Sequence, residues 1–205
     1  MYLYRLLPDL AHPQVRRDLA DPYQMHCTLA RAFSADDDTP PAKFLWRLEA
    51  DRGADPVVLV QSDHVGHWVR LLERFPGYAS EPARKTVDLV SALQSGREYL
   101  FRLRANPTVT RAGKRHGLVR EEDQLGWLSR QGDRLGFGIS SCVVTRQQRL
   151  GSSRRKSGGT TITVFTCQFD GRLEVRDAAL LAEAMAAGIG HAKSLGLGLL
   201  SLARG

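Results

Sequence analysis

The pattern of hydrophobic and polar residues along the chain predicts a protein of mixed strands and helices. Short runs with the alternation or β-branched content of strands are 2–6, 43–50, 56–62, 83–90, 97–105, 137–145, 160–169 and 197–203. Runs with a helical period are 23–33, 67–75, 121–131 and 177–187. Asp21 before Pro22 is a favourable start for the first helix, and Asp177 has the same role for the last.

The predicted elements follow the order strand, helix, strand, strand, helix, strand, and this order then recurs. Two successive βαββαβ units indicate an α+β fold of tandem ferredoxin-like domains. We place these domains at residues 1–93 and 94–205. Because no sequence repeat is visible between the halves, this prediction rests on the order of the elements alone.

Composition adds a charge asymmetry to this picture. Residues 1–93 contain 11 Lys and Arg against 13 Asp and Glu, whereas residues 94–205 contain 18 against 9. The stretches 99–120 and 137–160 contain no acidic residue. A basic half of this kind favours a polyanionic partner, nucleic acid before membrane, although a solvated charged face explains it equally well.

Both acid-free stretches are predicted to contain long connections. Residues 106–120 are expected to form a loop, and residues 146–159 the connection between the two central strands of the second unit. Long loops are often functional, and a slender basic hairpin suits the groove of a nucleic acid.

Other features exclude several classes of protein. The chain has no run of eighteen apolar residues and no signal-peptide pattern, so we expect a cytoplasmic protein without membrane association. The three cysteines, Cys27, Cys142 and Cys167, are odd in number and far apart in the sequence, which does not fit a disulfide framework or a zinc site. We expect them to be small buried hydrophobes.

The C-terminal stretch GIGHAKSLGLGLLSLARG has four glycines within eleven positions and a single lysine, Lys193. Such a loop suggests phosphate binding, because glycine lets backbone N–H groups approach an anion closely. Neither the P-loop nor the dinucleotide-binding pattern is present, since Ala192 precedes Lys193 and Lys193 occupies the third glycine position. An enzyme that binds a small nucleotide here is therefore a less favoured alternative.

Several stretches resemble a known family. They are DPYQMH (21–26), FLWRLEA (44–50), YLFRLRANPTVT (99–110), GKR (113–115) and GIGHAKSLGLGLLSLA (188–203). They are similar to the CasE-type endoribonucleases of type I-E CRISPR systems, which cut the repeat hairpins of precursor CRISPR RNA.

The resemblance implies tandem ferredoxin-like domains and cleavage at the 3′ base of the repeat stem without a metal or another cofactor. The 2′-hydroxyl would attack the neighbouring phosphate and leave a 2′,3′-cyclic phosphate and a 5′-hydroxyl. The enzyme would be a monomer when free. It would then stay on the CRISPR repeat RNA hairpin as a subunit of the RNA-guided surveillance complex, beside the other subunits.

The resemblance places His26 at the family's catalytic position. Histidine suits proton transfer near neutral pH, and Tyr23 lies on the same face of the predicted helix three residues earlier. Whether His26 is the base, the acid or both is left open. Tyr23 is expected to orient the ribose or phosphate, and Arg31 is a candidate phosphate stabiliser. His64 and His67 have H-x-x-H spacing without a further ligand, so no metal is expected there.

The residues expected to contact RNA come from the basic stretches and the glycine loop. They are Arg102, Arg104, Lys114, Arg115, Arg149, Arg154, Arg155, Lys156, Gly188, Gly190, Lys193 and Ser194. His191 is expected to contribute no chemistry. Gly196 and Gly198 fit RNA contact and simple strand packing equally well. A subunit that binds the stem-loop without cleaving it is the main alternative function.

Overall fold

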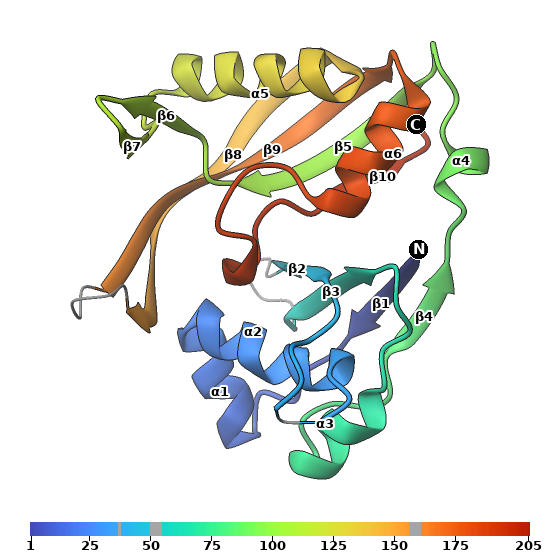
Figure 1. Ribbon diagram of the computed structural model, residues 1–205, viewed down its shortest axis with the longest axis vertical. Helices are drawn as coiled ribbons and strands as arrows, with labels where there is room; N and C mark the ends of the chain where they lie inside the picture. The colour runs from blue at the N-terminus through green and yellow to red at the C-terminus, as the bar shows by residue number, and fades with distance from the viewer. Residues whose placement is uncertain (37, 50–54, 156–160) are drawn as a thin grey trace. The chain divides into compact units, whose positions relative to one another are not determined.

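The structure is a computed structural model that describes residues 1–36, 38–49, 55–155 and 161–205 (Figure 1). The side chains of residues 153–155 and 161 are outside this description. The chain divides into two compact units, which are considered separately. Unit 1 consists of Met1–Val87, Ser152–Ile162 and Ser194–Gly196, and unit 2 of Asp88–Gly151, Thr163–Lys193 and Leu197–Gly205.

Unit 1 contains an antiparallel sheet of four strands. They are β1 (Tyr2–Leu6), β2 (Phe44–Glu49), β3 (Val57–Ser62) and β4 (Ala83–Thr86), in the order β2-β3-β1-β4. This order is the one that a βαββαβ chain adopts in a ferredoxin-like domain. Val60 lies opposite both Tyr4 and Trp46, and all three side chains belong to the core of the unit.

The helices of unit 1 are α1 (Pro13–Ala20), α2 (Pro22–Ala30) and α3 (Trp68–Arg74), with a 3-10 turn η1 (Arg31–Phe33) after α2. Helix α1 was not predicted from the pattern. It is mostly polar, and its N-cap is His12, whose Nδ1 accepts a hydrogen bond from the backbone N–H of Gln14. Histidine is not among the preferred N-cap residues, so the local signal for this helix was weak.

The prediction of a strand over residues 83–90 was wrong at its end. Strand β4 stops at Thr86, and Asp88 caps the short helix α4 (Leu89–Ala92) by accepting a hydrogen bond from the N–H of Val90. The cap competes with extension of the strand because a free Asp side chain satisfies the first N–H groups of a helix.

Unit 2 contains a second antiparallel sheet, in the order β10-β5-β9-β8. Its strands are β5 (Glu98–Ala105), β8 (Phe137–Arg155), β9 (Thr161–Val175) and β10 (Leu200–Ala203), and its helices are α5 (Glu121–Leu135) and α6 (Ala178–Ala187). Asp177 caps α6, as predicted, and accepts hydrogen bonds from the N–H groups of Ala179 and Leu180. The prediction of two ferredoxin-like folds in one α+β chain is confirmed.

The loop predicted at residues 106–120 is in fact largely a β-hairpin. Strands β6 (Thr108–Arg111) and β7 (Lys114–Gly117) pair with each other through the turn Ala112-Gly113. Both turn residues have positive φ, 48° and 72°, which matches the tight turns that favour the twist of a hairpin. The sequence lacked the Asn-Gly or Asp-Gly signal that marks such turns.

The connection predicted at residues 146–159 was placed too early in the chain. Residues 146–155 continue β8, with partly buried and exposed side chains alternating from residue 141 to 150. A ladder of backbone hydrogen bonds does not require apolar side chains, so the polar sequence RQQR concealed this strand. Residues 156–160 lie outside the described part of the chain.

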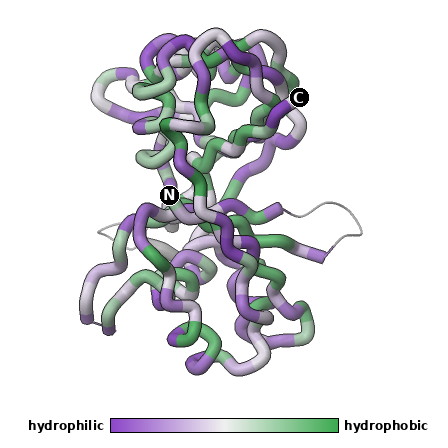
Figure 2. Tube along the Cα trace, turned by 90° about the vertical axis from the view of Figure 1, so that its right-hand side faces the viewer, coloured by the Kyte–Doolittle hydropathy of each residue, from purple (hydrophilic) through white to green (hydrophobic). Residues whose placement is uncertain are grey.

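Each unit has its own hydrophobic core, and Figure 2 shows hydrophobic stretches interspersed with hydrophilic ones along the chain. In unit 2 the rings of Trp127 on α5 and Phe169 on β9 stack with centroids 6.2 Å apart. The prediction of buried cysteines holds for Cys167, which is buried, and in part for Cys142, which is half-buried, but it is wrong for Cys27, which is exposed. Among the described helices, none is both long enough and apolar enough to span a membrane.

Candidate functional site

Helix α2 begins as its sequence predicts. The carboxylate of Asp21 accepts a hydrogen bond of 2.9 Å from the backbone N–H of Tyr23, and Pro22 occupies the first turn. Proline is favourable here because the first N–H groups of a helix have no partner within it. This start fixes the register of the helix, and therefore the direction of the residues that follow.

The predicted pair Tyr23 and His26 lies together on α2. Their ring centroids are 6.3 Å apart and the ring planes differ by 28°. Both side chains are partly buried, and the Nδ1 atom of His26 is buried. The spacing of three residues therefore places a phenol and an imidazole on one face of the helix, as expected.

Sequence reasoning missed Phe44, the residue on which the His26 ring rests. The two centroids are 4.9 Å apart with planes at 18°, and Phe44 in turn stacks on Phe33 at 4.8 Å and 12°. Phe44 is the first residue of β2 and is 7% exposed. Its alternation with buried Trp46 indicated a core position, but not which helix residue it would contact.

Helix α2 is held from the α1 side by a buried polar network around Asp18. The carboxylate of Asp18 accepts hydrogen bonds from the Tyr78 hydroxyl, at 2.8 Å, and from the Gln14 amide, at 2.9 Å. The Gln14 amide also donates to the hydroxyl of Thr28 on α2, and the Tyr78 hydroxyl lies 3.4 Å from the sulfur of Met25. These contacts fix the helix that carries Tyr23 and His26.

Ionisation of this network is shifted by its burial. Burial raises the pKa of Asp18, although its hydrogen bonds from Tyr78, Thr28 and Gln14 act in the opposite direction. Burial and the neighbouring Asp18 carboxylate raise the pKa of Tyr78 far above its usual range. Tyr78 therefore stays protonated and acts as a hydrogen-bond donor.

Arg31 follows α2 in the turn η1, and its guanidinium lies over the ring of Phe75, 6.0 Å from the centroid. His26 instead rests on Phe44, so these two predicted residues use different aromatic supports. The structure brings Tyr23 and His26 together, while Arg31 packs toward the end of α3.

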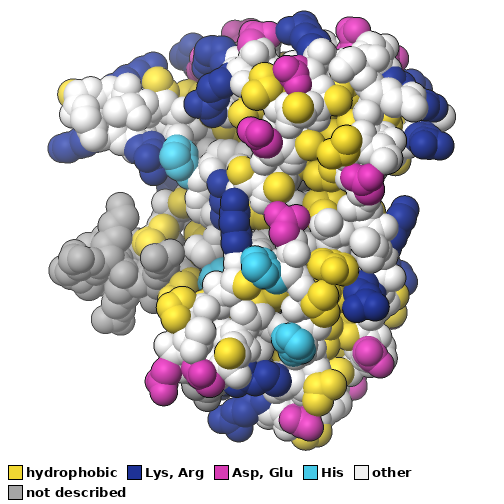
Figure 3. Space-filling model, turned by 45° about the vertical axis from the view of Figure 1, so that its right-hand side comes forward, with side chains coloured by type: hydrophobic (Ala, Val, Ile, Leu, Met, Phe, Trp, Pro, Cys, Tyr) yellow, Lys and Arg dark blue, Asp and Glu magenta, His cyan; other side chains and the backbone are white. Residues whose placement is uncertain are grey.

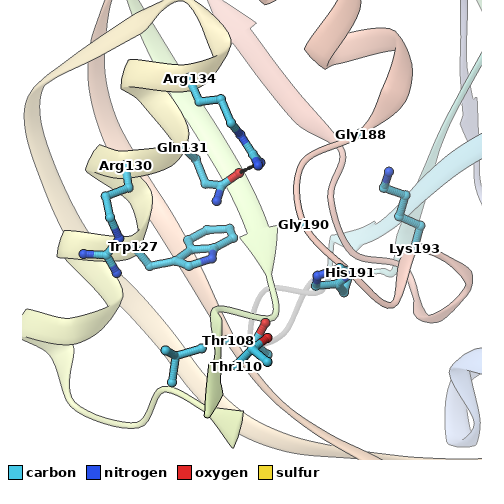
Figure 4. A pocket seen from close by; sticks show the side chains of 11 residues that line it. Thr108, Thr110, Trp127, Arg130, Gln131, Arg134, Gly188, Gly190, His191 and Lys193 are labelled. Carbon is cyan, nitrogen blue, oxygen red and sulfur yellow. Dashed lines mark hydrogen bonds between the residues drawn. The ribbon is translucent and has the colours of Figure 1, made fainter. Parts of the chain in front are cut away.

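In unit 2 the glycine loop borders a pocket of about 600 Å³, shown in Figure 4. Gly188 ends α6 with φ of 78°, and Gly190 has φ of 85° and faces the indole of Trp127. Lys193 lies in the 3-10 turn η2 (Lys193–Leu195). A Cβ at Gly190 would stand 3.3 Å from the indole, so this glycine permits a close approach of the loop to α5.

The other two glycines of the loop are explained by packing. A Cβ at Gly196 would lie 2.9 Å from the ring of Trp46, and one at Gly198 would lie 2.8 Å from the carbonyl oxygen of Ile189. The N–H of Gly198 donates to the carbonyl of Arg104, while its own carbonyl accepts from Ile189. Both glycines precede β10 (Leu200–Ala203), and their close packing with positive φ is sufficient to account for these two positions.

The sequence is similar to a known family and to two named proteins. The sequence model of the family described as "CRISPR associated protein" matches residues 1–204. The chain belongs to this CRISPR-associated family. The CRISPR-associated endoribonuclease Cse3 of Thermus thermophilus is 37% identical over 215 residues, which cover 99% of this chain and 100% of that protein. The CRISPR system Cascade subunit CasE of Escherichia coli is 33% identical over 132 residues, 58% of this chain and 64% of that protein.

Solved structures of this CRISPR-associated family have the same fold. Cse3 bound to a 19-nucleotide RNA superposes with a TM-score of 0.87 at 37% identity, covering 99% of this chain and 100% of that one. Cas6e of Escherichia coli gives a TM-score of 0.70 at 29% identity, with both chains fully covered.

The remaining residues predicted to bind RNA are spread over this CRISPR-associated chain. Lys114 and Arg115 are exposed on β7, and Arg149 is exposed on β8. Arg102 forms an ion pair with Asp170, with Nε 2.6 Å from Oδ1, and Arg104 is buried. Within unit 2, Arg102 is therefore engaged in an ion pair and Arg104 is enclosed by the fold.

Three of the predicted residues fall wholly or partly outside the described part of the chain. Arg154 and Arg155 belong to the backbone of β8, but their side chains are not described, and Lys156 lies outside the described residues. Ser194 begins the short segment that groups with unit 1. Within the described ranges, no three His, Cys, Asp or Glu side chains are grouped to hold a metal ion, His64 and His67 included.

Proposed function

We propose that this protein is a metal-independent endoribonuclease that binds the CRISPR repeat stem-loop and cleaves precursor CRISPR RNA at the 3′ base of the stem. The observation that carries the proposal is the Tyr23–His26 pair on α2 in a chain that is 37% identical, over its whole length, to an endoribonuclease. Another similar structure is Cse3 with an RNA representing a pre-cleavage complex, at 35% identity and a TM-score of 0.84.

The reaction consists of two proton transfers around one phosphate. The 2′-oxygen loses its proton and forms a bond to the adjacent phosphorus, and the P–O5′ bond breaks. The leaving 5′-oxygen takes up a proton, and the products are a 2′,3′-cyclic phosphate and a 5′-hydroxyl. No water, metal or redox partner is consumed in this step.

We assign proton transfer to His26. Because its Nδ1 is buried, Nε2 is the nitrogen that serves the RNA. The stacking of the ring on Phe44 restricts its rotation, which reduces the entropy lost on reaching the reactive geometry. The hydroxyl of Tyr23 orients the ribose or the phosphate by hydrogen bonding, since a phenol is a weak base at neutral pH.

The basic residues of unit 2 supply the affinity for the stem. Lys114, Arg115 and Arg149 are exposed and carry charge that phosphates attract. Figure 3 shows, on one face of the molecule, Lys and Arg side chains spread among acidic ones. The product stays bound, and the protein acts in the cytoplasm as a subunit of an RNA-guided surveillance complex, in keeping with a similar chain from such a complex at 26% identity.

The test uses the repeat hairpin of the host's own CRISPR array in EDTA. We expect cleavage with a cyclic-phosphate end, and no cleavage of a matched RNA carrying a 2′-deoxy nucleotide at the cut. The variant His26→Ala should bind the hairpin and leave it intact. Cleavage of the deoxy RNA, or a requirement for metal, would contradict the mechanism, and binding without cleavage by the wild type would support a non-cleaving stem-loop subunit.

A further inference from the structure

The pocket of about 600 Å³ in unit 2 contains residues to which the proposed cleavage reaction gives no role. It lies between α5, the glycine loop and the first strand of the β6–β7 hairpin. Figure 4 shows Trp127, Gln131 and Arg134 reaching from α5 toward a space that His191 faces from the loop. This volume is within the usual range for sites that hold a small organic ligand.

The lining of the pocket is basic. Arg130 and Arg134 are exposed and stand one helical turn apart on α5, and Lys193 contributes a further positive charge from η2. Of the described residues that line the pocket, none is acidic. The rim therefore attracts an anion, and arginine is well suited to phosphate because its guanidinium can donate two parallel hydrogen bonds.

The pKa of His191 is affected by the positive charge around the pocket. Partial burial lowers the pKa of His191, and the neighbouring cations Arg115, Lys193 and Arg134 lower it further. A neutral imidazole retains one nitrogen that accepts and one that donates a hydrogen bond. An imidazole at this position can therefore form a hydrogen bond with a base or a ribose.

The remaining walls suit the other parts of a nucleotide. Val109 and the edge of Trp127, which is 5% exposed, form an apolar side. Thr108 and Thr110 carry hydroxyl groups that can bond to a sugar or a base edge. The Oε1 atom of Gln131 accepts a hydrogen bond of 2.6 Å from Arg134, so Gln131 offers its amide N–H groups. The combination of cationic rim, apolar side and uncharged polar groups matches a nucleotide better than it matches inorganic phosphate alone.

We propose that this pocket binds a single unpaired nucleotide of the RNA beside the repeat stem, with its phosphate attracted to the cationic rim that includes Arg130, Arg134 and Lys193. The inference rests on the proposed RNA-binding function and adds a subsite to it. A double-stranded stem is far too wide to enter a pocket of this size, whereas an unpaired nucleotide can be splayed into it. Neither arginine belongs to the catalytic pair on α2.

The proposal is tested by comparing the affinity of the protein for a bare stem-loop RNA with its affinity for RNAs that carry a flank. One RNA is the bare stem-loop, and the others carry unpaired nucleotides on the 5′ or the 3′ side, all with a 2′-deoxy nucleotide at the cut. We expect the wild type to bind at least one flanked RNA about fivefold tighter than the bare stem, equivalent to about 1 kcal/mol. The double variant Arg130→Ala/Arg134→Ala should lose this advantage while binding the bare stem-loop as the wild type does.

Two further measurements make the result specific. The variant Arg97→Ala removes an exposed arginine of unit 2 that bonds to Gln94 outside the pocket, and it should keep the advantage of the flank. A 4-thiouridine placed in the flank should cross-link to a peptide from residues 121–135 or 188–193. Both arginines of the double variant are exposed on α5, so circular dichroism should show an unchanged fold.

The outcomes separate this proposal from the function on which it rests. A wild type that binds and cleaves the stem-loop but gains nothing from either flank overturns the subsite alone. Equal weakening of bare and flanked RNA by the double variant also overturns it, because the arginines would then serve the stem. Binding of free AMP or UMP that depends on the arginines, without a flank effect, assigns the pocket to a free nucleotide and overturns it. Failure to bind any repeat RNA overturns the proposed function and the subsite together.

Discussion

The imidazole of His26 lies on the ring of Phe44, with centroids 4.9 Å apart and planes at 18°. One residue comes from α2 and the other from the first position of β2, 18 residues later in the chain. The stack links the proposed catalytic side chain to the core of unit 1 through Phe33, which lies on Phe44.

Replacing Phe44 with leucine should lower the cleavage rate through the loss of the stack on His26. The smaller, flexible side chain leaves the His26 ring free to rotate, and we expect the single-turnover rate to fall by about tenfold, or about 1.4 kcal/mol of activation free energy. Affinity for the hairpin should change little. The matched control is Phe33→Leu, which alters the same stack without touching His26. Equal losses of cleavage rate in both variants would show that the stack affects cleavage only through the stability of unit 1.

Replacing Tyr78 with phenylalanine should destabilise unit 1. The hydroxyl of Tyr78 donates a buried hydrogen bond of 2.8 Å to Asp18, and its removal leaves that carboxylate with one donor fewer. The expected cost is about 1–3 kcal/mol in the free energy of unfolding, measured by urea denaturation. Tyr99→Phe, which removes a hydrogen bond to the carbonyl of Ala92 in unit 2, is a comparison for the loss of a tyrosine hydroxyl. An unchanged denaturation midpoint in Tyr78→Phe would contradict the role of this network.

The raised pKa of Asp18 predicts a pH dependence of stability. The folded protein holds this proton more tightly than the unfolded chain, whose carboxyl titrates near 3.8. The protonated form therefore contributes its full stabilisation below the pKa of the unfolded chain. This contribution to the free energy of unfolding is lost as pH rises through the pKa of the folded state. Asp18→Asn removes the titration, so the unfolding free energy of the wild type should fall relative to the variant as pH rises from about 4. A constant difference across the acid range would show that the pKa is not raised.

The three thiols should differ in reactivity. Cys27 is exposed, whereas burial raises the pKa of Cys142 to about 11 and that of Cys167 to about 12. The thiolate is the reacting form, so a thiol reagent near pH 8 should modify Cys27 first and Cys167 only after unfolding. Cys27 follows His26 directly, and a bound stem-loop should slow its modification. Cys27→Ser identifies the fast phase, and fast labelling that RNA does not affect would argue against RNA binding on this part of α2.

The hairpin β6–β7 should contribute charge to stem binding. Lys114 and Arg115 are exposed on β7, and each phosphate contact releases counterions when it forms. The double variant Lys114→Ala/Arg115→Ala should weaken binding of the bare stem-loop and reduce the slope of log affinity against log salt by about 1 to 2. Arg97→Ala serves again as the control for a lost surface charge. An unchanged salt slope would show that the hairpin does not contact phosphates.

The sequence by itself determined the local features of this protein. Asp21 and Pro22 specify the start of α2, and the three-residue spacing then puts Tyr23 and His26 on one face. The order of strands and helices was sufficient for the fold class, because alternation and helical period are properties of neighbouring residues. The glycine-rich stretch pointed to the loop that borders the unit 2 pocket.

The tertiary structure decided the contacts between residues distant in the chain. Packing places Phe44 against His26, and it places Arg130 and Arg134 beside the glycine loop. No local periodicity of the sequence encodes these contacts. The same reason explains the errors, since the pairing of β6 with β7 and the extension of β8 depend on backbone hydrogen bonds rather than on apolar side chains. A one-dimensional pattern specifies which face of an element is buried, but the residue that covers this face is chosen only when the elements pack together.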